Sequence, residues 1–271
     1  MRWIKKFLRH IVYLNIIVAL STALLSSGFC YYLQISNWLN YGFLALFSTL
    51  AVYNGQRLFK SRSSYKTPWL KWVEDNKLLL YVAVVLFAIV AVAFMLIIGF
   101  QSSEAFVLLS VSIVISMFYV IPLGRRNLRE ISHLKIHLIA ISWSAVLIVF
   151  PMLNASVSQS VFWFGLAHYF YIVAVSIPFD IRDLKYDAST QKTIPQVVGV
   201  TWSKAIAIMF ILIFVAMILY IDERFLLNPL FFVAVAIQVG LILFMTEKKS
   251  DIYTAGWIDA AIAILGMSYF L

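Results

Sequence analysis

The chain has little charge and only one cysteine. Charged residues make up 12% of its 271 residues, whereas 63% are hydrophobic. A soluble domain has about 25% charged and about 45–50% apolar residues. Because a soluble fold would have to expose the excess apolar surface to water, the composition argues against a soluble domain and favours a membrane protein. The single Cys30 excludes an internal disulfide framework.

Several functional motifs are also missing. The chain has no Walker-type phosphate loop and no glycine pattern of a dinucleotide-binding fold. His133 and His137 are four residues apart, but neither an HExxH motif nor a third ligand accompanies them, so we do not expect a zinc site.

Nine apolar segments are candidates for membrane-spanning helices. A spanning helix needs about 20 mostly apolar residues, and these runs lack the alternation that is typical of a β-barrel. The sequence therefore predicts an all-α polytopic membrane protein, a single domain over residues 1–271. Its nine transmembrane helices are expected at residues 11–35, 39–59, 78–99, 105–122, 134–151, 160–178, 203–221, 226–245 and 254–271.

The basic residues predict the orientation of these helices. If the N-terminus is cytoplasmic and the helices alternate in direction, every lysine and arginine except Arg224 falls on the cytoplasmic side. This distribution follows the positive-inside rule, which explains the formal charge of +9 without nucleic acid. We expect an integral protein of the cell inner membrane, with a cytoplasmic N-terminus and the C-terminus on the opposite side. The longer polar loops, and therefore any chemistry, fall on the cytoplasmic side.

Three carboxylates follow the sixth predicted helix. Asp180, Asp183 and Asp187 are spaced by three and four residues, so a helix would place them on one face. Such carboxylates repel one another unless a cation lies between them, and their hard oxygens suit Mg²⁺ bridged to substrate phosphates. The simpler interpretation is a solvated helix end in which Arg182 and Lys185 neutralise the acids.

The stretch at residues 180–199, DIRDLKYDASTQKTIPQVVG, resembles the second aspartate-rich motif of the UbiA superfamily of intramembrane prenyltransferases. The shared features are the spacing of the aspartates and, after a polar run, Thr193, Pro195 and Gly199. The resemblance implies a nine-helix bundle around a central cavity. It also implies that the three aspartates are catalytic residues that hold Mg²⁺.

A second stretch, at residues 119–143, resembles the loop after the fourth helix of that family. The loop has a tyrosine and a proline, then basic residues, then a lysine that opens the fifth helix; here these are Tyr119, Pro122, Arg125, Arg126 and Lys135. Since a guanidinium donates two parallel hydrogen bonds to a phosphate, the resemblance implies that the basic residues bind a diphosphate. Lys192 is included among these expected contacts. Ordinary positive-inside charge is the simpler alternative.

The chain departs from the family at the end of the second predicted helix. Members carry a first aspartate-rich motif there, but this chain has NGQRLFKSR at residues 54–62 and keeps only Asn54. Arg57 and Arg62 are expected either to contact a diphosphate directly, replacing metal charge with guanidinium charge, or to mark a disabled metal site.

Asp259 lies within the last predicted helix. Ionisable residues within spans are costly and usually face a cavity or a partner. We therefore expect Asp259 to line the substrate cavity with Asn54 and Tyr119, or to pair with a lysine near the membrane surface.

Together these features predict a UbiA-type prenyltransferase that transfers an isoprenyl group from a polyprenyl diphosphate to a lipophilic or aromatic acceptor. The alternative is a catalytically inactive relative that binds lipid or assists assembly, and its support is the loss of the first motif. A small transporter is less favoured, since no matched pair of Gly/Pro-broken helices is evident.

Overall fold

The computed structural model describes residues 2–60, 67–119, 121, 128, 131, 133–157, 160–186 and 191–271, with backbone only for residues 2–6. Every element found in these residues is helical, so the predicted all-α class is confirmed for this part of the chain.

The long helices follow the predicted apolar segments closely. Two helices, α4 and α11, begin with a proline, Pro68 and Pro229. Proline suits this position because the backbone N–H that it lacks would have no partner within the helix. The elements in chain order are α1 (Arg2–Tyr13), α2 (Ile16–Tyr32), α3 (Trp38–Lys60), α4 (Pro68–Asp75), α5 (Lys77–Ile98), α6 (Ser103–Phe118), α7 (Leu134–Ser144), η2 (Ala145–Val149), α8 (Phe150–Asn154), α9 (Val161–Asp183), α10 (Ile194–Ile221), η4 (Glu223–Leu227), α11 (Pro229–Leu243), η5 (Tyr253–Ile258) and α12 (Asp259–Ser268).

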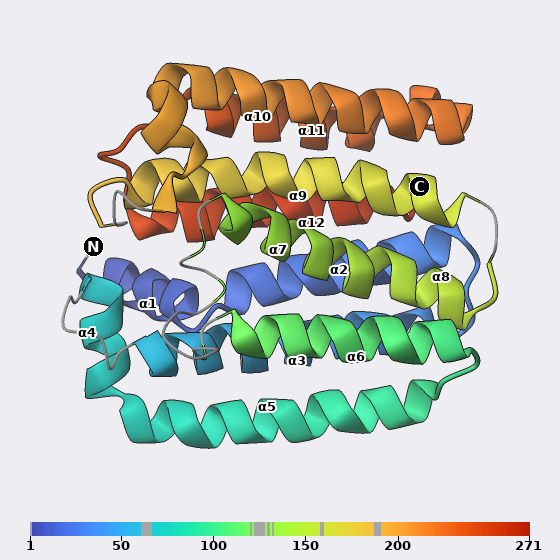
Figure 1. Cartoon of the computed structure of the whole chain (residues 1–271), viewed down its shortest axis with the longest axis horizontal. Helices are drawn as coiled ribbons and strands as arrows, with labels where there is room; N and C mark the ends of the chain where they lie inside the picture. Colours follow the sequence, from blue (N-terminus) through green and yellow to red (C-terminus); the bar gives the residue numbers. More distant parts are fainter. Residues whose placement is uncertain are drawn as a thin grey trace.

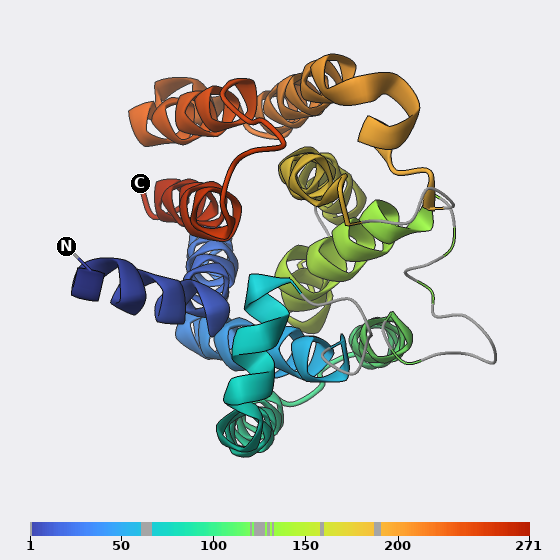
Figure 2. The ribbon, with the colours of Figure 1, turned by 90° about the vertical axis from the view of Figure 1, so that its left-hand side faces the viewer.

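The long helices run roughly parallel to one axis and form a bundle (Figure 1). Many neighbours in sequence are neighbours in space, such as α2 with α3 and α9 with α10, and α12 returns to pack against α2. Viewed from the end, α10 and α11 lie outside α9 and α12, and α5 lies at the opposite edge (Figure 2). The two chain termini lie at opposite ends of the bundle (Figure 1).

Length and composition support part of the predicted membrane topology. In the part of the chain that the structure describes, four helical runs are long and apolar enough to cross a membrane, namely α5, the continuous run α7–η2–α8, α9 and α10. The bent pair α1–α2 would make a fifth. These helices indicate an integral membrane protein. The prediction of nine spans goes further than this, since α6 and α11 have only 16 and 15 residues, fewer than the roughly 20 that cross a bilayer unaided.

The first predicted span is not one straight helix. Asn15 adopts a left-handed conformation, with φ 58°, and α1 meets α2 at an angle of 58°. Asparagine tolerates this conformation better than most residues because its short side chain bonds locally. Here the Asn15 amide donates to Asn54 Oδ1 at 3.0 Å, and Asn54 Nδ2 donates to the Leu14 carbonyl at 3.0 Å. The prediction of a continuous helix over residues 11–35 is therefore wrong at this break, which a side chain from α3 stabilises.

At the far end of the bundle, Arg224 pairs with Asp222. Partial burial alone would raise the pKa of Asp222, but hydrogen bonds from Arg224 and from the Tyr32 hydroxyl lower that pKa to about 2. The one basic residue that departs from the predicted charge distribution thus lies beside a carboxylate that stays ionised.

Two glycines let α2 and α12 approach each other closely. A Cβ on Gly28 would lie 2.1 Å from the Gly266 carbonyl oxygen, and one on Gly266 would lie 2.5 Å from the backbone at Leu24 and Leu25. Small residues at such contacts are typical of helix packing in membranes. The closure of the bundle therefore depends on these positions.

We expect Gly266→Ala to lower the free energy of unfolding by about 1–3 kcal/mol, because the backbones must separate to admit the methyl group. Thermal unfolding in detergent, followed by circular dichroism, measures the change. Gly240→Ala on α11 is the matched control, since nothing lies within 4 Å of its added Cβ. Equal melting temperatures for Gly266→Ala and the unmodified protein would contradict this account of the packing.

Candidate functional site

A cavity of about 630 Å³ lies inside the bundle. Its walls come from α2, α3, α5, α6, α7, α9 and the start of α12. Most lining side chains are apolar, including Leu44, Met95, Leu109 and Ile172, but one end is charged. The cavity is therefore amphiphilic along its length. Its charged lining residues are Arg57, Lys60, Lys135, Asp180, Arg182, Asp183 and Asp259.

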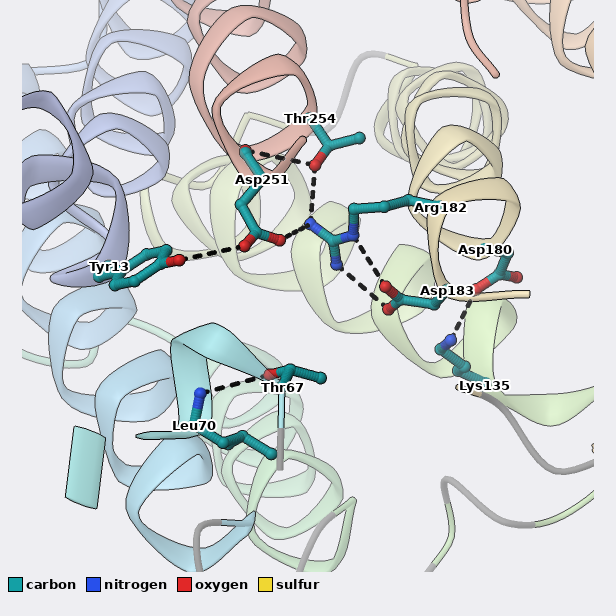
Figure 3. A network of polar contacts seen from close by, with 9 residues as sticks. All are labelled: Tyr13, Thr67, Leu70, Lys135, Asp180, Arg182, Asp183, Asp251 and Thr254. Atoms are coloured by element: carbon teal, nitrogen blue, oxygen red, sulfur yellow. Dashed lines mark hydrogen bonds and ion pairs between the residues drawn. The ribbon is translucent and has the colours of Figure 1, made fainter. Parts of the chain in front are cut away.

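The last turn of α9 supplies two of the carboxylates. Asp180 and Asp183 are three residues apart and both line the cavity, as their spacing predicts. Each lies beside a cationic side chain (Figure 3): Lys135 Nζ is 2.6 Å from Asp180 Oδ1, and Arg182 Nε is 2.8 Å from Asp183 Oδ1. Opposite charges brought together in a low-dielectric setting stabilise one another strongly. The Lys135–Asp180 pair holds the start of α7 against the end of α9.

Arg182 is the centre of a larger polar network. It is 7% exposed, and its guanidinium donates to both oxygens of Asp183, at 2.8 and 3.1 Å. A third nitrogen, Nη1, donates to Thr254 at 2.7 Å and lies 3.2 Å from Asp251. Asp251 in turn accepts a hydrogen bond from the Tyr13 hydroxyl (Figure 3). One planar side chain thus links α9 to η5 and, through Asp251, to α1.

The end of α3 brings two further cations to the same cavity. Arg57 and Lys60 are three residues apart, so they share a face of the helix, and both line the charged end. The Arg57 guanidinium lies 3.8 Å from the ring centre of Trp69 on α4, a stacking arrangement that orients its plane. The resemblance to the UbiA superfamily implies carboxylates at the end of this helix. The cavity has the basic groups of Arg57 and Lys60 there instead.

Aromatic side chains line the wall between the charged and the apolar ends. Trp143 donates from Nε1 to the Tyr53 hydroxyl at 3.1 Å, and Tyr119 lines the same cavity while only 8% exposed. Asp259, 6% exposed, also lines the cavity. The faces of aromatic rings attract cations, so this wall suits a reaction that develops positive charge on carbon.

The predicted site residues divide into three groups. Those brought together at the cavity are Arg57, Tyr119, Lys135, Asp180, Asp183 and Asp259. Two are elsewhere: Asn54 is buried at the α1–α2 break, where it also donates to the Leu50 carbonyl, and Lys192 is exposed and not part of the cavity lining. Outside the described residues lie Arg62, Pro122, Arg125, Arg126 and Asp187.

Sequence reasoning missed some members of the site. Lys60 was predicted only as part of the cytoplasmic charge, although its spacing from Arg57 is a usable signal. Asp251 and Tyr13 are far from α9 in sequence and no motif links them. The simpler interpretation was a solvated helix end in which Arg182 and Lys185 neutralise the acids. Arg182 does pair with Asp183, but Asp180 and Arg182 are buried rather than solvated.

Carboxylate oxygens are the ligands that Mg²⁺ prefers, and Asp180 and Asp183 present such oxygens to the cavity. Among the described residues, however, no group of three or more His, Cys, Asp or Glu side chains is placed to hold a metal ion. The third predicted ligand, Asp187, lies outside them. A metal ion at Asp183 would compete with the Arg182 guanidinium, which engages both oxygens of that carboxylate.

The other residues of the resembling stretch build the start of α10. Thr193 donates its backbone N–H to the Gln196 side chain at 3.0 Å, Pro195 stands in the first turn, and Gly199 has φ 78°, where the helix kinks. Glycine adopts this conformation without the steric cost that other residues meet. These three residues therefore shape the segment that follows the aspartates.

Comparison of this chain with protein-family models, with curated proteins and with solved structures finds no match.

We expect Arg182→Gln to lower the free energy of unfolding by about 3–5 kcal/mol, because it leaves Asp183 and Asp251 without their buried counter-charge. Chemical unfolding in detergent micelles measures the change. Arg224→Gln is the control: this side chain is 76% exposed, and its loss should cost less than about 1 kcal/mol. Similar losses for the two variants would contradict the central role of Arg182.

Proposed function

We propose that the protein is an intramembrane prenyltransferase. In this proposal its nine helical segments all cross the membrane, and its cavity binds an isoprenyl diphosphate. The observation that supports this best is the amphiphilic cavity: four cations gather at one end, and apolar side chains line the rest. A molecule with an anionic head and a hydrocarbon tail matches both parts.

The diphosphate lies at the charged end in this proposal. Arg57, Lys60 and Lys135 come from two different helices and all line that end. A guanidinium and two ammonium groups donate charge-assisted hydrogen bonds, which are stronger than neutral ones. Asp180 positions Lys135, and Asp183 positions Arg182, since each carboxylate is within ion-pair distance of its partner.

The reaction breaks the bond between the allylic carbon and the diphosphate oxygen. The same carbon forms a bond to the acceptor, which loses a proton, and the diphosphate leaves with the bonding electron pair. Fixed positive charges stabilise the leaving group as its negative charge develops. Tyr53, Tyr119 and Trp143 line the same cavity, and in this proposal their rings stabilise the developing carbocation.

The Mg²⁺ ion stays a prediction. Asp180, Asp183 and Asp187 are the residues that would hold it, and it would add positive charge beside the diphosphate. The acceptor is expected to be lipophilic or aromatic, because the rest of the cavity offers it an apolar environment.

A non-catalytic lipid-binding protein is the second candidate. The observation in its favour is that both described aspartates of the motif already pair with side-chain cations. Such a protein would bind the isoprenyl diphosphate and release no diphosphate with any acceptor.

We expect Arg57→Gln and Lys60→Gln each to weaken the binding of geranylgeranyl diphosphate about tenfold or more. A hydrogen bond to a charged group contributes about 1.5–3 kcal/mol, and about 1.4 kcal/mol is a tenfold change in affinity. Isothermal titration calorimetry of the protein in detergent measures it. Lys204→Gln is the control, because Lys204 bonds to the Leu243 carbonyl and is not among the cavity-lining residues.

The titration is run with Mg²⁺ and again with EDTA. Binding that requires Mg²⁺ supports the aspartates as metal ligands, whereas binding that persists in EDTA supports capture by the side-chain cations. Unchanged affinity in both cation variants would contradict the proposed diphosphate site. Release of diphosphate with a panel of hydroquinone and phenol acceptors then distinguishes the enzyme from the lipid-binding alternative.

A further inference from the structure

The first helix lies across one end of the bundle. Figure 2 shows the long helices end-on but α1 from its side, with the N-terminus at the outer edge. The bend between α1 and α2 measures 58° and falls at the left-handed Asn15. Because of this bend, α1 does not continue the direction of α2 through the bundle.

The inner end of α1 is fixed to the protein. Val12 and Tyr13 are buried in an apolar cluster with residues of α3, α4 and α5. The Tyr13 ring stacks on Trp69 of α4, with 5.1 Å between the ring centres, and the Tyr13 carbonyl accepts a hydrogen bond from Trp69 Nε1 at 3.0 Å. The Tyr13 hydroxyl donates to Asp251 at 3.3 Å. These contacts set the direction in which α1 leaves the bundle.

The outer part of α1 is uncovered. Phe7 is 67% exposed and Leu8 is 41% exposed, although both are large and apolar. Arg9 is also exposed, and among the residues that the structure describes it forms no ion pair. Exposed apolar side chains next to an exposed cation mark a surface that another component of the membrane covers.

The sequence of α1 divides the helix into two stripes. At 3.6 residues per turn, its lysines and arginines fall on one side and its apolar residues on the other. We call the two sides the basic stripe, formed by Arg2, Lys5, Lys6 and Arg9, and the apolar stripe, formed by Trp3, Ile4, Phe7, Leu8 and Ile11. The first ten residues contain no Asp or Glu. This pattern is typical of helices that lie in the membrane interface and attract anionic lipid.

We propose that α1 lies in the interface of the bilayer and binds the headgroups of anionic phospholipids through its basic stripe. The apolar stripe then enters the boundary between headgroups and acyl chains. A lipid surface fits better than a protein partner, because α1 extends sideways from helices that are themselves suited to a membrane. The inference goes beyond the proposed function and does not depend on it, since it requires only that the protein is embedded in a bilayer.

A spin label at residue 7 tests where α1 lies. The protein carries Phe7→Cys together with Cys30→Ala, because Cys30 is its single cysteine. It is reconstituted in nanodiscs of phosphatidylcholine and phosphatidylglycerol. We expect the label to be accessible to oxygen and protected from a water-soluble nickel chelate, as a label at Leu86→Cys on the exposed side of α5 should be. Lys248→Cys, exposed in the polar turn before η5, is the control for water access.

A charge variant tests the choice of lipid. Lys6→Gln with Arg9→Gln removes two cations of the basic stripe, and native mass spectrometry counts the lipids that stay bound after release from nanodiscs with equal parts of the two lipids. We expect the ratio of bound phosphatidylglycerol to phosphatidylcholine to fall about threefold or more, because each cation near an anionic surface adds attraction. Lys248→Gln with Lys249→Gln is the matched control, and its ratio should fall less, since it removes the same charge from outside α1.

The two tests must agree. Protection of the label at residue 7, with a selective loss of phosphatidylglycerol in the charge variant, supports the proposal. A label as accessible to the nickel chelate as the one at residue 248 overturns the interfacial location of α1. An unchanged lipid ratio overturns the binding of headgroups, and Lys5→Gln with Lys6→Gln gives that result if size-exclusion chromatography shows that the first variant misfolds. No isoprenyl diphosphate is used, so failure of the proposed function would leave these results standing.

Discussion

The arrangement of this bundle depends on how Arg182 is neutralised. A guanidinium that is almost entirely buried among apolar helices is costly unless its charge and its hydrogen bonds are met. Asp183 meets two donors, and Thr254 with Asp251 meets another. Asp183 belongs to α9, whereas Asp251 and Thr254 lie in the segment that leads into α12. The network therefore fixes the start of the last helix against α9. That helix in turn closes the ring on α2.

This neutralisation also determines what the cavity offers a ligand. Arg182 and Lys135 lie beside carboxylates, and α3 adds Arg57 and Lys60 to the lining of the same cavity. The stretch in which UbiA members carry the first aspartate-rich motif is the end of α3 in this chain. Arg57 and Lys60 of that helix line the cavity there, whereas Asp180 and Asp183 line it from α9. In our proposal these cations bind the diphosphate, and the apolar part of the cavity takes the start of the tail.

The sequence predicted the helical class and the positions of the apolar helices because long apolar runs leave few alternatives. It also placed Asp180 and Asp183 on one face, since helical spacing decides that. It could not predict the break at Asn15, which depends on Asn54 from another helix, nor the contribution of Asp251, which is distant in sequence. Asn54 was expected in the cavity. Its amide instead bonds to Asn15 and to the Leu14 carbonyl at the helix break, and to the Leu50 carbonyl.

An experimental structure with geranylgeranyl thiolodiphosphate, an analogue that resists cleavage, tests the central claim most directly. The account predicts the two phosphorus atoms at the charged end, with phosphate oxygens about 2.7–2.9 Å from nitrogens of Arg57, Lys60 or Lys135. It further predicts that the tail begins along the apolar lining of the same cavity. A diphosphate bound at any site away from these cations, with the cavity occupied by lipid or by nothing, would contradict the account.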